Sequence, residues 1–247
     1  MMGRTHATSG AVAFLVLIPP LRGLGVDLGG VGVATGAVAA AGAAMLPDLD
    51  HPQASIAHAL GPVTGVLARI TALLSGGHRQ GTHSVLGVLV ATTLSVGVMF
   101  VGGVAVGLEL SFLAALALAA IEVKFSRVTL VHTVLCLAAG VALTGLSIWQ
   151  QIPVAALPLA VGIGVAAHVV GDCLTEEGCP LLWPVPWRIS LLPLETEGLI
   201  ERFVVGPVLG VAAVVLVWQL SDQSALAPFV AAFRHGVAMF RSAVGPS

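Results

Sequence analysis

The sequence predicts an all-α protein, a polytopic transmembrane helical bundle of about six or seven spans whose interfacial loops carry a metal site. Hydrophobic residues make up 57% of the 247 positions, and the mean hydropathy is +1.03. Charged residues make up only 9%, whereas a soluble domain carries about 25%. The sequence also lacks a basic run of the kind that nucleic-acid partners need. We therefore expect a lipid bilayer, and not nucleic acid, as the partner of this chain.

Seven apolar stretches are candidate spans. A helix that crosses a membrane needs about 20 apolar residues, and the first and fourth stretches are shorter than that. The first could pass for a secretory signal, but no small-residue cleavage site follows Pro19-Pro20, so we expect a retained helix. In the second, many glycines and alanines allow close helix packing in lipid. The candidate spans are residues 7–20, 29–46, 84–102, 105–121, 129–149, 153–171 and 203–220.

The remaining segments are expected to lie outside the bilayer core. Residues 52–77 contain an amphipathic stretch between prolines and glycines, which favours a position along the membrane surface. Residues 173–202 combine prolines with Trp183 and Trp187, a composition typical of an interfacial loop. We expect residues 1–220 to form one transmembrane domain and residues 221–247 a C-terminal tail with a short amphipathic helix.

Three short polar clusters interrupt this apolar chain, and a histidine precedes them. Ionisable groups are costly in such a chain, so clustered Asp and His predict a bound cation. His168 and Asp172 are four residues apart, which places both side chains on one helix face. The alternatives to a metal site are a simple polar pair of His168 and Asp172 on their helix and, for Asp48 and Asp50, a turn that ends the preceding helix. The candidate metal ligands are His6, Asp48, Asp50, His78, His83, His168 and Asp172.

The positions of the clusters along the chain predict that they meet on one side of the membrane. His6 precedes the first span, Asp48 and Asp50 follow the second, His78 and His83 precede the third, and His168 and Asp172 close the sixth. Lys and Arg are commoner in cytoplasmic loops. On the cluster side we count seven (Arg4, Arg69, Arg79, Lys124, Arg127, Arg188 and Arg202), against three on the other (Arg22, Arg234 and Arg241). This predicts a site on the cytoplasmic face.

Nitrogen and carboxylate ligands together favour Zn²⁺, with Mn²⁺ or Fe²⁺ as alternatives. Seven candidate ligands exceed the needs of one tetrahedral ion, so we expect one or two ions. Such ions activate water and stabilise the leaving oxygen of a phosphate ester. The candidate catalytic residues are Asp48 or Asp50 as base, Arg79 for a phosphate oxygen and Thr82 as a hydrogen-bond donor. The three cysteines are an odd number, which argues against a disulfide framework, and Cys173 is a weak alternative as a thiolate ligand.

The motifs resemble those of the YdjM-like family of bacterial membrane-bound metal-dependent hydrolases. The resemblance rests on Leu46-Pro47-Asp48-Leu49-Asp50-His51-Pro52, His78-Arg79-Gln80-Gly81-Thr82-His83-Ser84 and His168-Val169-Val170-Gly171-Asp172. Thr5-His6, Pro180-Leu181-Leu182-Trp183-Pro184, Trp187-Arg188 and Leu199-Ile200-Glu201-Arg202-Phe203 are also similar. The resemblance implies a multi-pass protein of the bacterial inner membrane. The family's distant similarity to zinc-dependent phospholipase C, an all-helical multi-zinc enzyme, implies a phosphoester substrate. The nitrogen ligands of this chain are too few for a third zinc.

These observations lead to one favoured function and two alternatives. We expect a hydrolase that uses a metal-activated water at the cytoplasmic membrane interface, on a phosphoester of a lipid or another amphiphile. A divalent-cation transporter or sensor is the first alternative, but its ion-path residues should lie near the middle of the bilayer. The second alternative is a structural membrane protein that holds a static ion.

Overall fold

The computed structural model describes residues 2–121, 129–149, 156–192, 195–196 and 198–220. Within these residues the chain is helical, apart from short connections and the irregular segment that follows residue 173, which contains one isolated bridge between Cys179 and Ile189. The expected all-α class is therefore confirmed. The expected tail at 221–247 lies outside the described residues, as do four of the counted basic residues, Lys124, Arg127, Arg234 and Arg241.

Each of the seven apolar stretches coincides with a helix. The first stretch is broken at Leu17, because Pro19 and Pro20 lack a backbone donor and begin a new short helix. The helices are α1 (Gly3–Val16), α2 (Ile18–Gly23), α3 (Gly29–Ala43), η1 (Pro47–Asp50), α4 (Ser55–Ala59), α5 (Pro62–Ser75), η2 (Gly81–His83), α6 (Val85–Val101), α7 (Gly103–Ala120), α8 (Thr129–Trp149), α9 (Ala156–Cys173), η3 (Glu201–Val205) and α10 (Gly206–Leu220).

Among the described residues, four helices are long and apolar enough to cross a membrane. They are Gly29–Asp50, Gly103–Ala120, Ala156–Cys173 and Glu201–Leu220. The helices Pro62–Ser75 and Val85–Val101 are apolar but shorter. The total of six or seven spans therefore stays a prediction.

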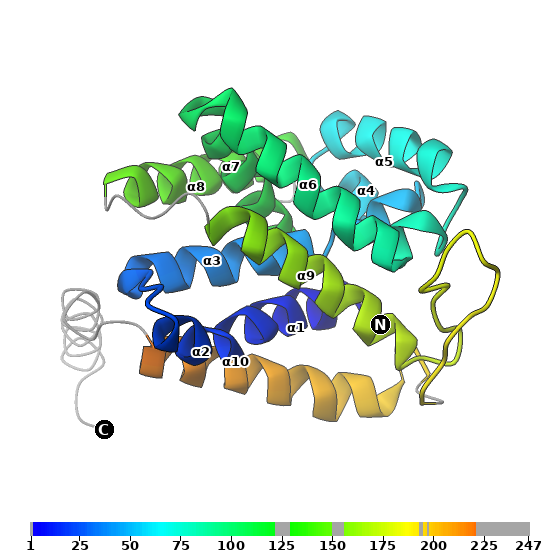
Figure 1. Ribbon diagram of the computed structural model, residues 1–247. Coiled ribbons are helices and arrows are strands. Elements are labelled where there is room, and N and C mark those ends of the chain that lie inside the picture. Colours follow the sequence, from blue (N-terminus) through cyan, green and yellow to red (C-terminus); the bar gives the residue numbers. More distant parts are fainter. Residues whose placement is uncertain (1, 122–128, 150–155, 193–194, 197, 221–247) are drawn as a thin grey trace, which may run out of the picture.

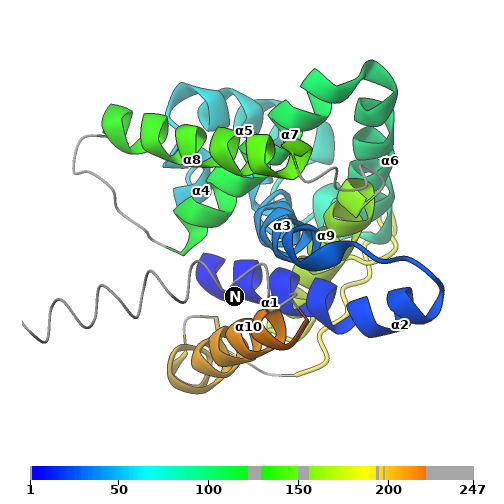
Figure 2. The ribbon, with the colours of Figure 1, turned by 90° about the vertical axis from the view of Figure 1, so that its left-hand side faces the viewer.

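Helices α1, α3 and α9 pack against one another at the centre of the bundle, with α10 beside α1 and with α6 beside α9 (Figures 1 and 2). Phe14, Val33 and Val161 are among the buried side chains of this core. Glycine allows the helices to approach closely. A Cβ on Gly164 of α9 would lie only 2.3 Å from the backbone oxygen of Ala40 in α3. The close contact at Gly164 thereby fixes α9 relative to α3.

This packing brings several helix ends to the same end of the bundle. The beginning of α1, the residues after α3 and the last turn of α9 lie there, next to the loop that follows α9 (Figure 1). Helix α2 and the turn into α3 lie at the other end. Most functional candidates are carried by helix ends and 3₁₀ turns, namely α1, η1, η2 and α9, whereas His78 and Arg79 lie in the short connection between α5 and η2.

Candidate metal centre

His83 and His168 face each other at the centre of the polar cluster. Nδ1 of His168 lies 2.7 Å from the backbone oxygen of Ala44, and since a carbonyl only accepts, this nitrogen carries a proton. The hydroxyl of Thr82 donates to Asp50 Oδ2 at 2.5 Å, so its oxygen accepts from Nδ1 of His83 at 3.0 Å. In neutral rings both Nε2 atoms then carry lone pairs, yet they lie 3.1 Å apart. A proton or a metal ion between them is needed to make this arrangement favourable.

Two carboxylates complete a cage around this point. Asp172 Oδ2 lies 3.5 Å from Nε2 of both histidines. Asp48 Oδ1 lies 3.7 Å from Nε2 of His83 and 3.6 Å from Nε2 of His168. A tetrahedral Zn²⁺ with bonds of about 2.0–2.1 Å holds its ligand atoms about 3.3 Å apart. The four residues therefore fit a divalent ion in both donor type and spacing.

The four side chains of the cage differ in their exposure. The side chains of His83 and His168 are 0% exposed and that of Asp172 is 1% exposed, whereas that of Asp48 is 22% exposed. Solvent, or a ligand, can therefore approach from the side of Asp48.

His6 adds a third imidazole to the buried side of the cage. Its Nε2 lies 3.1 Å from Asp172 Oδ1, and its ring stacks on His168 with centroids 3.8 Å apart. Donor atoms of His6, His168 and Asp172 all lie within 4.8 Å of one another. His6 is thus placed either to join the same ion or to bind a second ion that shares Asp172.

The short helix η3, which leads into α10, fixes the position of His6 through the beginning of α1. Oε1 of the buried Glu201, at the start of η3, accepts a hydrogen bond of 2.5 Å from the backbone nitrogen of Met2. The first turn of α1 then leads directly to His6, whose backbone nitrogen donates to the backbone oxygen of Met2 at 3.1 Å.

Asp50 and His78 lie on the opposite side of the His83 ring. Asp50 Oδ2 is 3.2 Å from Nδ1 of His83, and Asp50 Oδ1 is 2.7 Å from Nδ1 of His78. These three residues also form a group that could hold an ion, but His83 would then have to give up its Nδ1 proton. A carboxylate that accepts the second proton of a ligating imidazole is the usual partner of such a ligand. The geometry therefore favours Asp50 as the residue that orients His83.

Arg79 connects the two sides of the cluster. Its backbone nitrogen donates to Asp50 Oδ2 at 3.0 Å, and its Nε lies 3.4 Å from Asp172 Oδ2. Its φ of 53° is the only positive value among the described non-glycine residues, and such strain is frequent at functional sites. Nη1 of Arg79 pairs at 2.9 Å with the largely exposed carboxylate of Glu177. One end of the guanidinium thus neutralises Asp172, while the other holds an anion at the surface.

The neighbouring carboxylates change the proton affinity of His83. Burial alone would lower the pKa of His83, but the nearby carboxylates of Asp48 and Asp50 outweigh burial and raise this pKa from 6.5 to about 9. Without metal, His83 is therefore protonated at neutral pH and can donate from Nε2 to His168. A metal ion at Nε2 has to replace this proton.

The structure brings all seven proposed ligands and both Arg79 and Thr82 into one cluster. Asp48 and Asp50, separated by one residue, face different sides of His83. The three cysteines are buried and free, and the groups of possible metal ligands among the described residues contain none of them. Sequence reasoning missed the carbonyl of Ala44 and the pairing of Glu177 with Arg79. No pattern in the sequence marks a backbone acceptor, and an exposed glutamate gives no signal by itself.

The chain matches the family model of the YdjM inner membrane protein over residues 1–122 and 121–243. It therefore belongs to the YdjM family, as the sequence motifs predicted. No curated protein and no solved structure gives a significant match to it.

Proposed function

We propose that this member of the YdjM family is a multi-pass, metal-dependent hydrolase that acts on a phosphoester of a lipid or another amphiphile at the cytoplasmic membrane interface. The unequal burial of the four ligand side chains is the observation that carries the proposal. A static structural ion needs a closed set of ligands, whereas a catalytic ion keeps one position open. The exposure of Asp48 beside three fully buried ligands supports an ion held by those three, whose fourth position, on the side of Asp48, is open to water.

The location of the ligands in their helices favours a hydrolase over a transporter. Transported ions bind near the middle of the membrane, on helices that are broken there. Here His6 lies in the first turn of α1 and Asp172 in the last turn of α9. Both lie at one end of the bundle and not near its middle.

A divalent ion in the cage would supply an acidified water and would stabilise charge on the leaving oxygen. Asp48 is best placed to accept the proton of that water, because it is the exposed carboxylate of the cage. Asp50 is poorly suited to this task, since His78 occupies one of its oxygens and Thr82, His83 and the Arg79 nitrogen occupy the other.

Arg79 would bind the phosphoryl group. Its Nη1 already holds the carboxylate of Glu177, whose side chain is 66% exposed. An exposed carboxylate is easily exchanged for a phosphate oxygen, with which arginine forms strong charge-assisted hydrogen bonds. Nε of Arg79 would stay beside Asp172 and keep the guanidinium aligned with the cage.

Metal analysis of the purified protein is the first test of this proposal. His168→Gln and Asp172→Asn should each reduce bound zinc to near background. The first removes an imidazole ligand of the cage, and the second removes the negative charge of a carboxylate ligand. His58→Gln and Asp27→Asn serve as matched controls, since both residues are exposed and lie outside the ligand groups. Unchanged zinc in both cage variants would refute the assignment of the site.

Hydrolysis is the second test. The zinc-loaded protein in detergent should cleave a phosphomonoester or a phosphodiester from a small aryl and alkyl series. Asp48→Asn should lower kcat by about 100-fold or more, the usual effect of losing a general base, whereas Asp27→Asn should leave kcat unchanged. A protein that binds zinc but cleaves no ester would favour the static metal site.

A further inference from the structure

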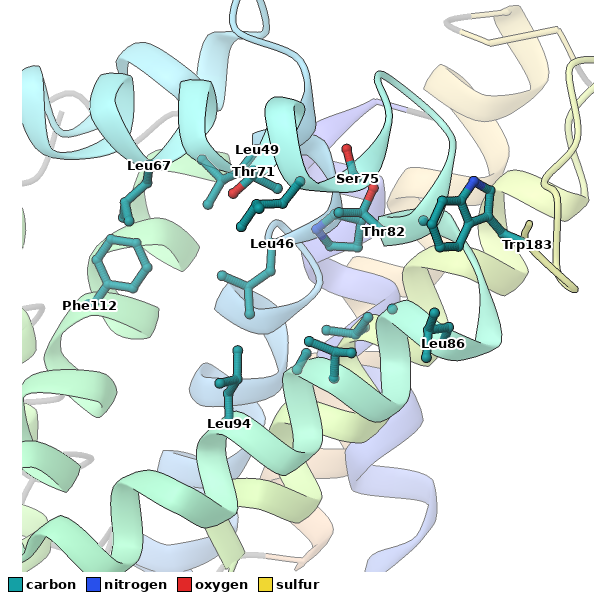
Figure 3. A pocket seen from close by; sticks show the side chains of 17 residues that line it. Leu46, Leu49, Leu67, Thr71, Ser75, Thr82, Leu86, Leu94, Phe112 and Trp183 are labelled. Carbon is teal, nitrogen blue, oxygen red and sulfur yellow. The ribbon is translucent and has the colours of Figure 1, made fainter.

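A cavity of about 400 Å³ lies beside the metal centre, between α5 and α6 (Figure 3). Its volume falls within the usual range for ligand pockets. Apart from the hydroxyls of Thr71, Ser75 and Thr82 and the indole of Trp183, the side chains along its wall are apolar. Trp183 and Thr82 lie toward one end, and Leu67 and Phe112 toward the other.

The cavity and the metal centre share a wall. Thr82 contributes to the cavity lining, and its Oγ1 also contacts Asp50 and His83. Leu46, Pro47 and Leu49 line the cavity as well, and they are direct sequence neighbours of Asp48 and Asp50. A ligand in the cavity therefore has one end next to the polar cluster.

Two of the four polar side chains on the wall, Thr82 and Ser75, already use their hydroxyl protons within the protein. The hydroxyl of Thr82 donates to Asp50, and the hydroxyl of Ser75 donates to Gly77 O at 3.1 Å. Neither has a proton left for a ligand. The cavity thus offers dispersion contacts and burial of apolar surface, which suit hydrocarbon and not a sugar or a nucleotide.

The cavity is also continuous with the apolar outside of α6. Leu86, Val90 and Leu94 line it, and they are 43%, 49% and 66% exposed. In a protein of the inner membrane, such a surface faces lipid. A hydrocarbon chain can therefore pass sideways from the bilayer into the cavity without crossing water.

From these observations we infer that the cavity binds one hydrocarbon chain of the substrate, which makes the substrate a lipid phosphoester whose headgroup lies at the Thr82 end. The inference rests on the proposed function, because it assigns the chain to a substrate of the metal centre. A second copy of the protein is the competing occupant of this surface.

The inference is tested with dodecyl phosphate that carries a diazirine at the end of its chain, added to the zinc-loaded full chain in nanodiscs. Photolysis should label the peptides that contain Leu67 and Phe112, and an excess of unlabelled dodecyl phosphate should suppress this labelling. Val90→Trp should fill the cavity and reduce the labelling at least tenfold. Val96→Trp is the matched control, because Val96 is exposed on the same helix but does not line the cavity.

Hydrolysis by the same variants separates this inference from the proposed function. Val90→Trp should raise KM for dodecyl phosphate at least tenfold and leave KM for methyl phosphate unchanged. If methyl phosphate is cleaved while Val90→Trp changes neither labelling nor KM for dodecyl phosphate, the inference is wrong and the hydrolase proposal stands. If labelling behaves as expected but no ester is cleaved, a hydrocarbon site exists and the hydrolase proposal falls. If Val90→Trp changes only the oligomeric state, the cavity belongs to an interface between copies.

Discussion

At the scale of single residues, the two ring nitrogens of His83 have different neighbours, which lets one imidazole be held in place by one nitrogen and bind an ion through the other. Nε2 points to His168, Asp48 and Asp172, while Nδ1 points to Asp50 and Thr82. Carboxylate and hydroxyl acceptors at Nδ1 select the tautomer whose Nε2 can bind metal. Asp48 and Asp50, separated by one residue, thus lie beside different nitrogens of His83.

Removal of the Thr82 hydroxyl should weaken metal binding without abolishing it. Thr82→Val keeps the shape of the side chain but removes both the donor to Asp50 and the acceptor for His83. Loss of such a supporting group typically lowers metal affinity by about 10- to 100-fold. Competition with a chromogenic zinc chelator measures this change. Thr71→Val on α5 is the control, and equal affinities for the two variants would argue against the orienting role of Thr82.

Zinc binding should become stronger as pH rises. Because the pKa of His83 is raised to about 9, this residue is protonated in the metal-free protein below that pH, and each bound ion must displace the proton. The apparent Kd for zinc should therefore fall about tenfold per pH unit up to about pH 9. Calorimetric titration at pH 7 in two buffers with different ionisation enthalpies gives the number of released protons. Release of no proton would contradict the protonation of His83.

At the scale of secondary-structure elements, the sequence predicts the helices better than it predicts their roles. Each of the seven apolar stretches contains a helix, because an apolar stretch between turns has few other stable forms in a membrane. The break at Leu17 was missed, since Pro19 and Pro20 were read as the end of a helix and not as the start of α2. The residues that cluster in the structure stand out in the sequence because charge is rare in this chain. The sequence could not predict which of these residues face a possible ion and which orient another ligand. That distinction depends on side-chain directions that only the packing of α1, α3 and α9 defines.

The close contact between α3 and α9 should be sensitive to a single methyl group. Gly164→Ala would place a Cβ 2.3 Å from the backbone oxygen of Ala40. His168 lies one turn further along α9, so a displacement of α9 that relieves this clash would also displace His168. Such overpacking costs about 1–3 kcal/mol, so both Tm in detergent and zinc content should fall. Gly97→Ala on α6 is the control, because the methyl group that it adds would have no neighbouring atom within 4 Å. A Gly164→Ala protein as stable as the Gly97→Ala protein would show that the helices are not packed this closely.

At the scale of the whole molecule, the bundle has two different ends. Every candidate ligand lies at one end, and the turn between α2 and α3 lies at the other (Figure 1). Residues far apart in the sequence meet because α1, α3 and α9 run between the same two ends. The sequence could predict this meeting from the order of the spans alone. It could not predict the cavity next to the site, because α5 and α6 form it only through their relative placement.

The orientation of this bundle in the membrane yields the last prediction. Since the basic residues predict a cytoplasmic site, Glu176→Cys, exposed near the cluster, should react with a membrane-impermeant maleimide in inside-out vesicles and not in intact spheroplasts. Asp27→Cys, exposed at the α2 end, should show the opposite pattern. The native cysteines are buried and give little background. Labelling of Glu176→Cys from outside intact cells would place the metal centre on the periplasmic side, and a periplasmic centre could act only on lipids of the outer leaflet.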